Sequence, residues 1–172
     1  RRKDEMPGVV ALVGGTGLWC GLGSGTIAIY DTEKWSAPPN TLVGAHSAEV
    51  TAICSAFGGF AAISGSADFS VKSWDLKGRC LSVLSAHHAP VKCLAAHGAE
   101  AVWTGAGDGT VFVARDQESE GKLSPEEGQV LKLPGPGGAS GIRCLKNLGG
   151  KMWAGTDDGR VGTSLHPGHR GG

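Results

Sequence analysis

Short apolar stretches alternate with polar residues along most of this chain, and none of them has the period of an amphipathic helix. The alternation is clearest at residues 26–30, which read TIAIY, and at residues 70–74, which read SVKSW. A period of two, carried by β-branched and aromatic residues, is typical of strands with one buried face. The pattern therefore predicts an all-β protein.

A glycine-centred phrase recurs four times at a regular distance. Its copies read WCGLGSGTIAIYD, ISGSADFSVKSWD, WTGAGDGTVFVAR and WAGTDDGRVGTSL. The shared glycines are Gly21, Gly65, Gly105 and Gly155, and they are separated by 44, 40 and 50 residues. Repeats of this length that consist of short strands indicate a β-propeller with one four-stranded antiparallel blade per repeat.

The repeats divide the chain into blades with approximate bounds 9–43, 50–84, 91–133 and 142–165. The fourth blade has only three predicted strands, because the chain continues as HPGHRGG. We expect residues 1–8 to be a linker or tail and residues 166–172 to be a flexible tail. An incomplete set of blades would expose sheet edges and apolar faces, so we expect these blades to be part of a larger ring.

The composition limits the kinds of partner and the cellular compartment that we expect for this chain. The 16 basic and 16 acidic residues give a net charge of zero, which argues against nucleic acid and against an anionic membrane surface. No apolar run is long enough to insert into a membrane. The five cysteines are an odd number without a Cys-x-x-Cys pair, which predicts buried free thiols and a reducing, cytoplasmic location.

The second repeat resembles the WD-repeat family. It has GAH at residues 44–46, SGSAD at residues 64–68 and a Trp-Asp pair at residues 74–75. The resemblance implies that His46, Ser64, Asp68 and Trp74 form a structural, hydrogen-bonded tetrad inside the blade. Such a chain is physically reasonable, because a half-buried carboxylate needs donors and a buried indole N–H needs an acceptor.

The other repeats depart from that pattern. The third repeat keeps His87, Thr104 and Asp108 but has Ala114 where the resemblance leads us to expect Trp. Three repeats share a Trp-x-Gly opening instead, which is similar to the divergent propellers attached to Rho exchange factors, Roco-type kinases and inositol polyphosphate 5-phosphatases. This similarity implies an alternative role, as the regulatory propeller segment of a larger signalling enzyme whose catalytic domain lies outside these residues.

Residues that could carry chemistry are better explained as parts of the repeat. His46 and His87 occupy the same place in successive repeats, and the carboxylates of Asp68, Asp108 and Asp158 belong to different blades. General acid–base catalysis needs groups that converge on one substrate. The glycine-rich residues 21–25 are not followed by a helix that could bind phosphate. We therefore expect no enzyme activity, no metal site and no cofactor.

Two segments stand out as surface features. Residues 116–127 read DQESEGKLSPEE, a composition that predicts a mobile acidic loop. Ser124, which precedes Pro125, could be phosphorylated by a proline-directed kinase or could remain unmodified. Phe69 occupies a turn position that is Gly in the other three repeats, so it could serve as a contact residue or fold back onto its own blade.

These observations predict a non-catalytic scaffold that binds a protein or peptide partner on the face formed by its loops. Further propeller repeats, in the same or another chain, are expected as a second kind of partner. The candidate partner-binding residues are Ser47, Glu49, Phe69, His87, His88 and Asp108.

Overall fold

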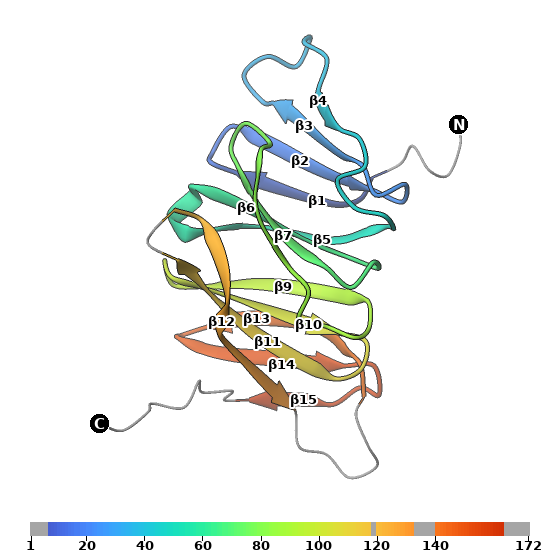
Figure 1. The fold of residues 1–172 in the computed structure, drawn as a ribbon, viewed down its shortest axis with the longest axis vertical. Coiled ribbons are helices and arrows are strands. Elements are labelled where there is room, and N and C mark those ends of the chain that lie inside the picture. Colours follow the sequence, from blue (N-terminus) through green and yellow to red (C-terminus); the bar gives the residue numbers. More distant parts are fainter. Residues whose placement is uncertain (1–6, 118–119, 133–139, 164–172) are drawn as a thin grey trace.

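The computed structural model describes residues 7–117, 120–132 and 140–163, and this part of the chain is all-β (Figure 1). Its strands form four consecutive antiparallel sheets, each built as a meander in which neighbouring strands follow one another in sequence. The prediction of four consecutive propeller-type sheets, the last of them incomplete, is confirmed. Among the described residues, no helix is long and apolar enough to cross a membrane.

The strand bounds follow the predicted repeats closely. The first sheet contains β1 (Pro7–Val13), β2 (Gly17–Leu22), β3 (Ile27–Asp31) and β4 (Asn40–Leu42). The second contains β5 (Val50–Ala56), β6 (Ala61–Ser66), β7 (Val71–Asp75) and β8 (Cys80–Leu84), with a 3-10 turn, η2 (Phe57–Gly59), between β5 and β6. The third contains β9 (Val91–His97), β10 (Ala101–Ala106), β11 (Thr110–Gln117) and β12 (Lys122–Lys132). The fourth contains β13 (Ile142–Leu148), β14 (Lys151–Thr156) and β15 (Val161–Thr163).

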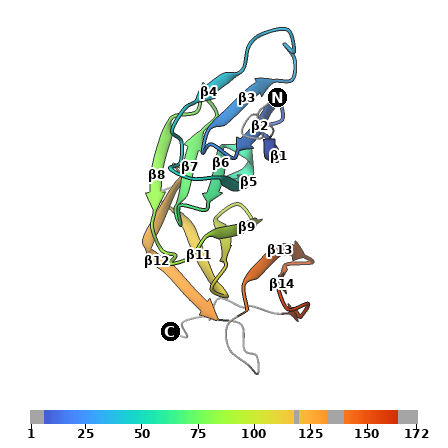
Figure 2. The same cartoon turned by 90° about the vertical axis from the view of Figure 1, so that its right-hand side faces the viewer.

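The four sheets stack face to face in an open arc. The first strands β1, β5, β9 and β13 contact one another in sequence. In Figure 2 these strands lie along one side of the stack, and β4, β8 and β12 lie along the other. The first and fourth sheets therefore lie at opposite ends of the arc.

Apolar side chains between the sheets form the core. Trp19, Val50 and Trp74 pack between the first and second sheets, and Trp103 and Ile142 pack between the third and fourth. Full burial of one such aliphatic side chain contributes about 1.5–3 kcal/mol. Side-chain packing therefore holds neighbouring sheets together, because the strand-pairing hydrogen bonds of the described residues run within each sheet.

The glycine that defines the repeat has a packing role in this stack. A Cβ atom at Gly21 would lie 2.6 Å from the Val50 side chain, and one at Gly65 would lie 2.6 Å from Val91. A Cβ atom at Gly105 would likewise lie 2.6 Å from Ile142. Each of these glycines thus lets the second strand of one sheet approach the first strand of the next, which explains why the residue recurs.

The acidic insertion is not the mobile loop that its composition predicts. β11 extends to Gln117 and pairs with β12, so that Arg115 lies opposite Ser124 and Asp116 opposite Leu123. The expectation is wrong because Leu123 is buried against the second sheet, and Asp116 accepts the Gly121 N–H at 2.7 Å. One apolar side chain and one turn bond therefore order the insertion on both sides of residues 118–119.

Two smaller expectations also change. The first strand begins at Pro7, two residues before the predicted start of the first blade, while the predicted tail at residues 166–172 lies outside the described residues. All five cysteines are free, as expected, but Cys80 and Cys144 are exposed. Cys80 belongs to an outer strand, and Cys144 lies on the side of the fourth sheet that no described sheet covers.

Candidate functional site

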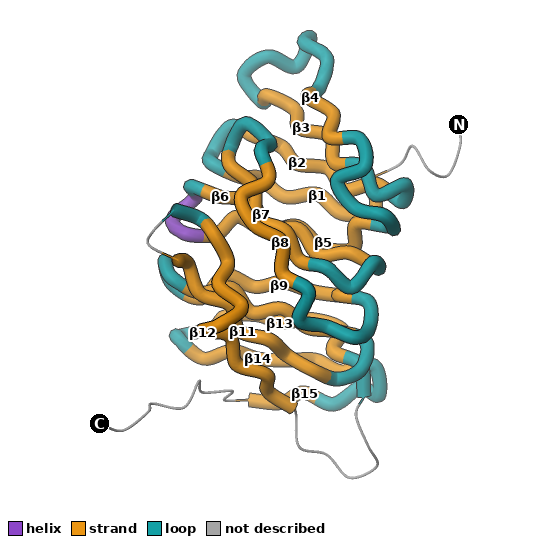
Figure 3. The backbone as a smooth tube through the Cα atoms, viewed as in Figure 1, coloured by secondary structure: helices purple, strands orange, loops and turns teal. Residues whose placement is uncertain are grey.

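The predicted binding residues gather at one end of the sheets, which we call the loop end. It comprises the turns β2–β3, β6–β7, β10–β11 and β14–β15 together with the connections at residues 43–49 and 85–90. In Figure 3 these turns and connections lie on the right-hand side of the stack, whereas η2 lies on the left. The β5–β6, β9–β10 and β11–β12 turns lie at the end opposite the loop end.

Backbone hydrogen bonds tie each connection to the turn of the sheet that it enters. The Ala67 N–H donates to the Glu49 carbonyl, and the Gly107 N–H donates to the Pro90 carbonyl, both at 2.9 Å. The Asp157 N–H makes the same bond to the Gly141 carbonyl at 2.9 Å. The repeated bond gives the exposed loops a rigid base and holds side chains from distant parts of the sequence together.

In the second sheet, four side chains form a continuous hydrogen-bonded chain. The Trp74 indole N–H donates to Ser64 Oγ at 2.8 Å, and Ser64 Oγ lies 2.7 Å from His46 Nε2. His46 Nδ1 lies 3.1 Å from Asp68 Oδ2. With a hydrogen on Nδ1, neutral His46 donates to the Asp68 carboxylate and accepts from the Ser64 hydroxyl. The structure therefore brings together the four residues that the resemblance implies.

Asp68 is the end of this chain and also organises the β6–β7 turn. Its carboxylate accepts the Ser70 N–H at 2.9 Å, the Ser70 hydroxyl at 2.6 Å and the Ser47 N–H at 3.0 Å. Partial burial raises the pKa of Asp68, but these hydrogen bonds and nearby His46 outweigh it and hold the pKa well below the usual range. The Asp68 carboxylate thus has a structural role.

His46 is neutral in this environment. Burial lowers its pKa, and the opposing effect of the Asp68 carboxylate is smaller. The imidazole is buried, and both of its nitrogens have partners. The residue is therefore a structural link and has no ring nitrogen free for catalysis or for a metal.

The third sheet builds a shorter version of the same arrangement. His87 Nε2 lies 2.6 Å from Thr104 Oγ1, and His87 Nδ1 lies 3.2 Å from Thr110 Oγ1. The Thr110 hydroxyl donates to the Asp108 carboxylate at 2.6 Å. A threonine thus stands between the histidine and the aspartate, and Ala114 supplies no side-chain donor.

His87 must be removed from the predicted contact residues. It is buried, and its two ring nitrogens are occupied by Thr104 and Thr110. Its neighbour His88 is exposed, as are Ser47 and Glu49, while Asp108 is half-buried. The burial of His87 agrees with the place that it shares with His46 in the repeat, rather than with a contact role.

Phe69 combines exposure with an unfavourable backbone conformation. Its φ angle is +73°, whereas the glycines at the same turn position, Gly25, Gly109 and Gly159, all have a φ angle of +81°. A residue with a side chain adopts this left-handed region at a cost of roughly 1–2 kcal/mol. The phenylalanine side chain is nevertheless 43% exposed at the tip of the turn.

An ion-pair cluster at the loop end was not predicted. The Asp157 carboxylate lies 3.0 Å from Lys92 Nζ and 2.9 Å from Arg143 Nε, and so connects the third and fourth sheets. Hydrogen bonds from Arg143 and Lys92 lower the pKa of Asp157. Lys92 and Arg143 are each the second residue of the first strand in their sheet. They meet at the Asp157 carboxylate because the third and fourth sheets stack on each other.

The remaining candidates do not form a chemical site. Ser124 lies in β12 and is buried, so a kinase could reach its hydroxyl only after local opening of the β11–β12 hairpin. Within the described ranges, no three His, Cys, Asp or Glu side chains are grouped closely enough to hold a metal ion.

Comparisons with known proteins agree with this architecture. The family model described as WD domain, G-beta repeat matches residues 37–75 and 78–113. The crystal structure of the computationally designed Ika4 protein has a TM-score of 0.69 and 26% identity, over 90% of this chain and 88% of that one. A chain in the crystal structure of the Mitotic Checkpoint Complex has a TM-score of 0.69 and 19% identity, over 92% of this chain and 52% of that one. No curated protein sequence matches this chain significantly.

Proposed function

We propose that this chain, in which residues 37–75 and 78–113 match the WD-repeat family model, is a non-catalytic scaffold that binds a protein or peptide partner at its loop end. WD40 repeats generally act as scaffolds for protein interactions, which supports the broad part of this proposal. The observation that carries the finer part is Phe69, an exposed aromatic residue held at a positive φ angle.

The surroundings of Phe69 suit a docking surface. Its turn is anchored by the hydrogen bonds that the Ser70 and Ser47 N–H groups donate to the Asp68 carboxylate, so the ring is presented on a rigid base. Exposed polar side chains lie on the same end, at Ser47, Glu49 and His88. An aromatic anchor surrounded by polar residues is the usual anatomy of a binding hot spot. We therefore assign Phe69 as the anchor and these neighbours, with Asp108, as the polar rim.

A double variant tests this assignment. Partners captured by the wild-type protein would be purified and their Kd values measured against Phe69→Ala/His88→Ala. The proposal predicts a loss of about 2 kcal/mol, or roughly 30-fold in Kd, with little change in Tm. Phe60→Ala is the matched control, because Phe60 is 78% exposed but lies in the β5–β6 turn at the opposite end. Unchanged Kd values for every partner in the double variant would place the binding surface elsewhere.

The two outer faces of the arc support a second kind of partner, namely further propeller sheets in the same or another chain. Val161 of the fourth sheet pairs with Gly155 and is 67% exposed. Val71 and Val111 pair with the equivalent glycines of the second and third sheets and are fully buried. At the other end of the arc, Val10 and Leu12 of β1 are also exposed. Apolar faces of this kind are normally covered. Sedimentation analysis should show that the isolated chain self-associates, and a compact, monodisperse monomer would contradict the idea.

A further inference from the structure

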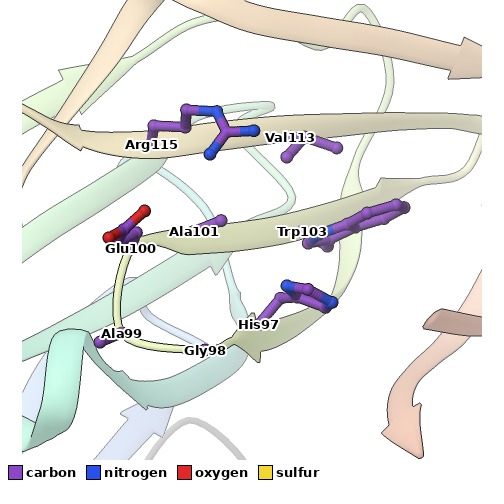
Figure 4. Close-up of a pocket in the computed structure, with 8 residues that line it drawn as sticks. All are labelled: His97, Gly98, Ala99, Glu100, Ala101, Trp103, Val113 and Arg115. Carbon is purple, nitrogen blue, oxygen red and sulfur yellow. The ribbon is translucent and has the colours of Figure 1, made fainter. Parts of the chain in front are cut away.

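A hollow of about 300 Å³ lies on the third sheet at the end opposite the loop end. Among the described residues, its walls come from the third sheet alone, from β9, β10, β11 and the turn between β9 and β10. Figure 4 shows the side chains of His97, Trp103 and Arg115 around it. The hollow is separate from the Phe69 surface, so a ligand bound in it would be independent of the proposed function.

Strand register explains why the hollow forms. Ala101 pairs with His97 on one side and with Arg115 on the other, which places a methyl group between two long side chains. The next row on the same face consists of Ala95, Trp103 and Val113. The hollow is therefore the space above Ala101, with the Trp103 indole and Val113 as an apolar wall.

The Trp103 indole nitrogen has no hydrogen-bond partner among the described residues. The side chain is only 1% exposed, and leaving a buried donor unpaired costs roughly 1–3 kcal/mol. By contrast, Trp74 in the second sheet donates to Ser64. An unpaired N–H in the wall of a hollow indicates that the occupant supplies an acceptor.

Arg115 brings a positive charge to a place where the first two sheets have aspartate. By register, Arg115 corresponds to Asp75, since each pairs with the first residue of the preceding strand. Asp75 accepts the N–H groups of Lys77 and Arg79 and so organises its own turn. Arg115 does not organise a turn in this way. Its guanidinium makes no ion pair with any described residue and extends beside the hollow in Figure 4.

The corresponding place on the second sheet is occupied by an extended segment of the neighbouring sheet. A Cβ atom at Gly121 would lie 3.2 Å from the Cβ of Ala61, which is the counterpart of Ala101. The Leu123 N–H also donates to Ser82 Oγ at 2.9 Å. An extended segment thus covers this position on the second sheet, while on the third sheet no described residue of the fourth sheet lines the hollow.

We propose that this hollow binds the side-chain carboxylate of an Asp or Glu residue in an extended peptide segment lying across the third sheet. A guanidinium is the donor best matched to a carboxylate, because it can form two parallel charge-assisted hydrogen bonds. The Trp103 N–H supplies a further donor to the same acceptor. His97 Nε2 lies 3.2 Å from the Gly150 carbonyl, which holds this ring at the edge of the hollow.

Glu100 provides a sharp internal control. It is exposed and lines the hollow at the β9–β10 turn, where Figure 4 shows its carboxylate beside Ala101. A second carboxylate in the hollow is repelled by Glu100 and attracted by Arg115. Charge removal at these two residues therefore has opposite effects on carboxylate binding, whereas an apolar or carbonyl ligand would be affected little by either.

The test follows the indole N–H signal of Trp103 by NMR, after assignment with Trp103→Phe. Titration with propionate, a mimic of the Glu side chain, should shift this signal in a saturable way and leave the Trp74 signal unmoved. Neutral propionamide, which has nearly the same shape, should bind at least tenfold more weakly. Arg115→Gln should weaken propionate binding at least tenfold, and Glu100→Gln should strengthen it severalfold.

A capped strand-forming peptide with one central Glu should then bind more tightly than propionate, and its Gln counterpart should lose that gain. An equal response to propionamide, a shift that does not saturate, or an equal effect of inorganic phosphate would overturn the carboxylate assignment. The unmoved Trp74 signal in Arg115→Gln verifies that the variant is folded. Phe69→Ala/His88→Ala should leave the titration unchanged, which keeps this site distinguishable from the loop end.

Discussion

Trp74 donates its indole N–H to the Ser64 hydroxyl at 2.8 Å, and both side chains are buried between the first two sheets. Through Ser64 the bond continues to His46 and to Asp68, whose carboxylate holds the turn that carries Phe69. The core of the second sheet is thus connected to the tip of an exposed loop by a single hydrogen-bonded chain. Changes at either end of this chain should be felt at the other.

Replacement of Asp68 by Ala should lower the free energy of unfolding by about 1–3 kcal/mol. The variant leaves His46 Nδ1 and the Ser47 and Ser70 N–H groups without their acceptor. Chemical denaturation measures the effect. Asp158→Ala is the control, because Asp158 holds the corresponding turn position in the fourth sheet but is exposed, so its loss should matter much less. Equal effects of the two substitutions would refute a special role for Asp68.

The two buried tryptophans should respond differently to replacement by Phe. Both variants lose part of a buried ring, but only Trp74→Phe breaks a hydrogen bond and strands the Ser64 hydroxyl. Trp103→Phe removes a donor that has no partner among the described residues. Trp74→Phe should therefore be less stable than Trp103→Phe by about 1 kcal/mol, as measured by urea denaturation. The reverse order would show that Trp103 has a partner in solution.

Acidification should weaken the fold in two stages. Burial lowers the pKa values of His46 and His87, so below about pH 6.5 the unfolded chain binds protons that the folded chain excludes. The contribution of these histidines to the free energy of unfolding is complete above that pH. It is lost as the pH falls through their pKa values in the folded state. The lowered pKa of Asp68 acts in the same direction, but only below about pH 4, where the carboxylate of the unfolded chain takes up a proton.

Urea denaturation at about pH 7.5 and about pH 5.5 separates the first stage from the second. The wild-type protein should be less stable at the lower pH. His46→Gln/His87→Gln should be less stable than the wild type at the higher pH but should change less between the two. A wild-type stability that is constant over this interval would contradict neutral burial of the two histidines.

Features of the structure could be predicted when the residues that cause them lie close together in the sequence. The recurring glycines and turn residues lie within a few positions of one another, so the repeat and its strands were predictable from spacing alone. The packing of Gly21 against Val50 shows why the same residue must recur in each sheet. The chain from Trp74 to Asp68 was predictable through the resemblance, since one repeat carries its whole pattern.

Features that depend on the stacking of different sheets could not be predicted in this way. Leu123 is a single apolar residue in an acidic stretch, and only its burial against the second sheet explains the β11–β12 hairpin. Asp157 meets Lys92 from 65 residues away in sequence. The hollow above Ala101 likewise depends on the register that places His97 and Arg115 on its two sides.

Replacement of Phe69 by Gly should separate the two roles that a residue at this position can have. Glycine adopts the φ angle of +73° without the steric cost that phenylalanine bears, although it is more flexible in the unfolded chain. The net effect should be a gain of about 0.5–1 kcal/mol in the free energy of unfolding, together with weaker partner binding. Gly109→Ala, which introduces a side chain at the equivalent position in the third sheet, should instead lower stability. If Phe69→Gly were less stable than the wild type, the ring would be contributing more by packing on its own blade than it costs in backbone strain, and Phe69 would be a structural residue rather than a contact.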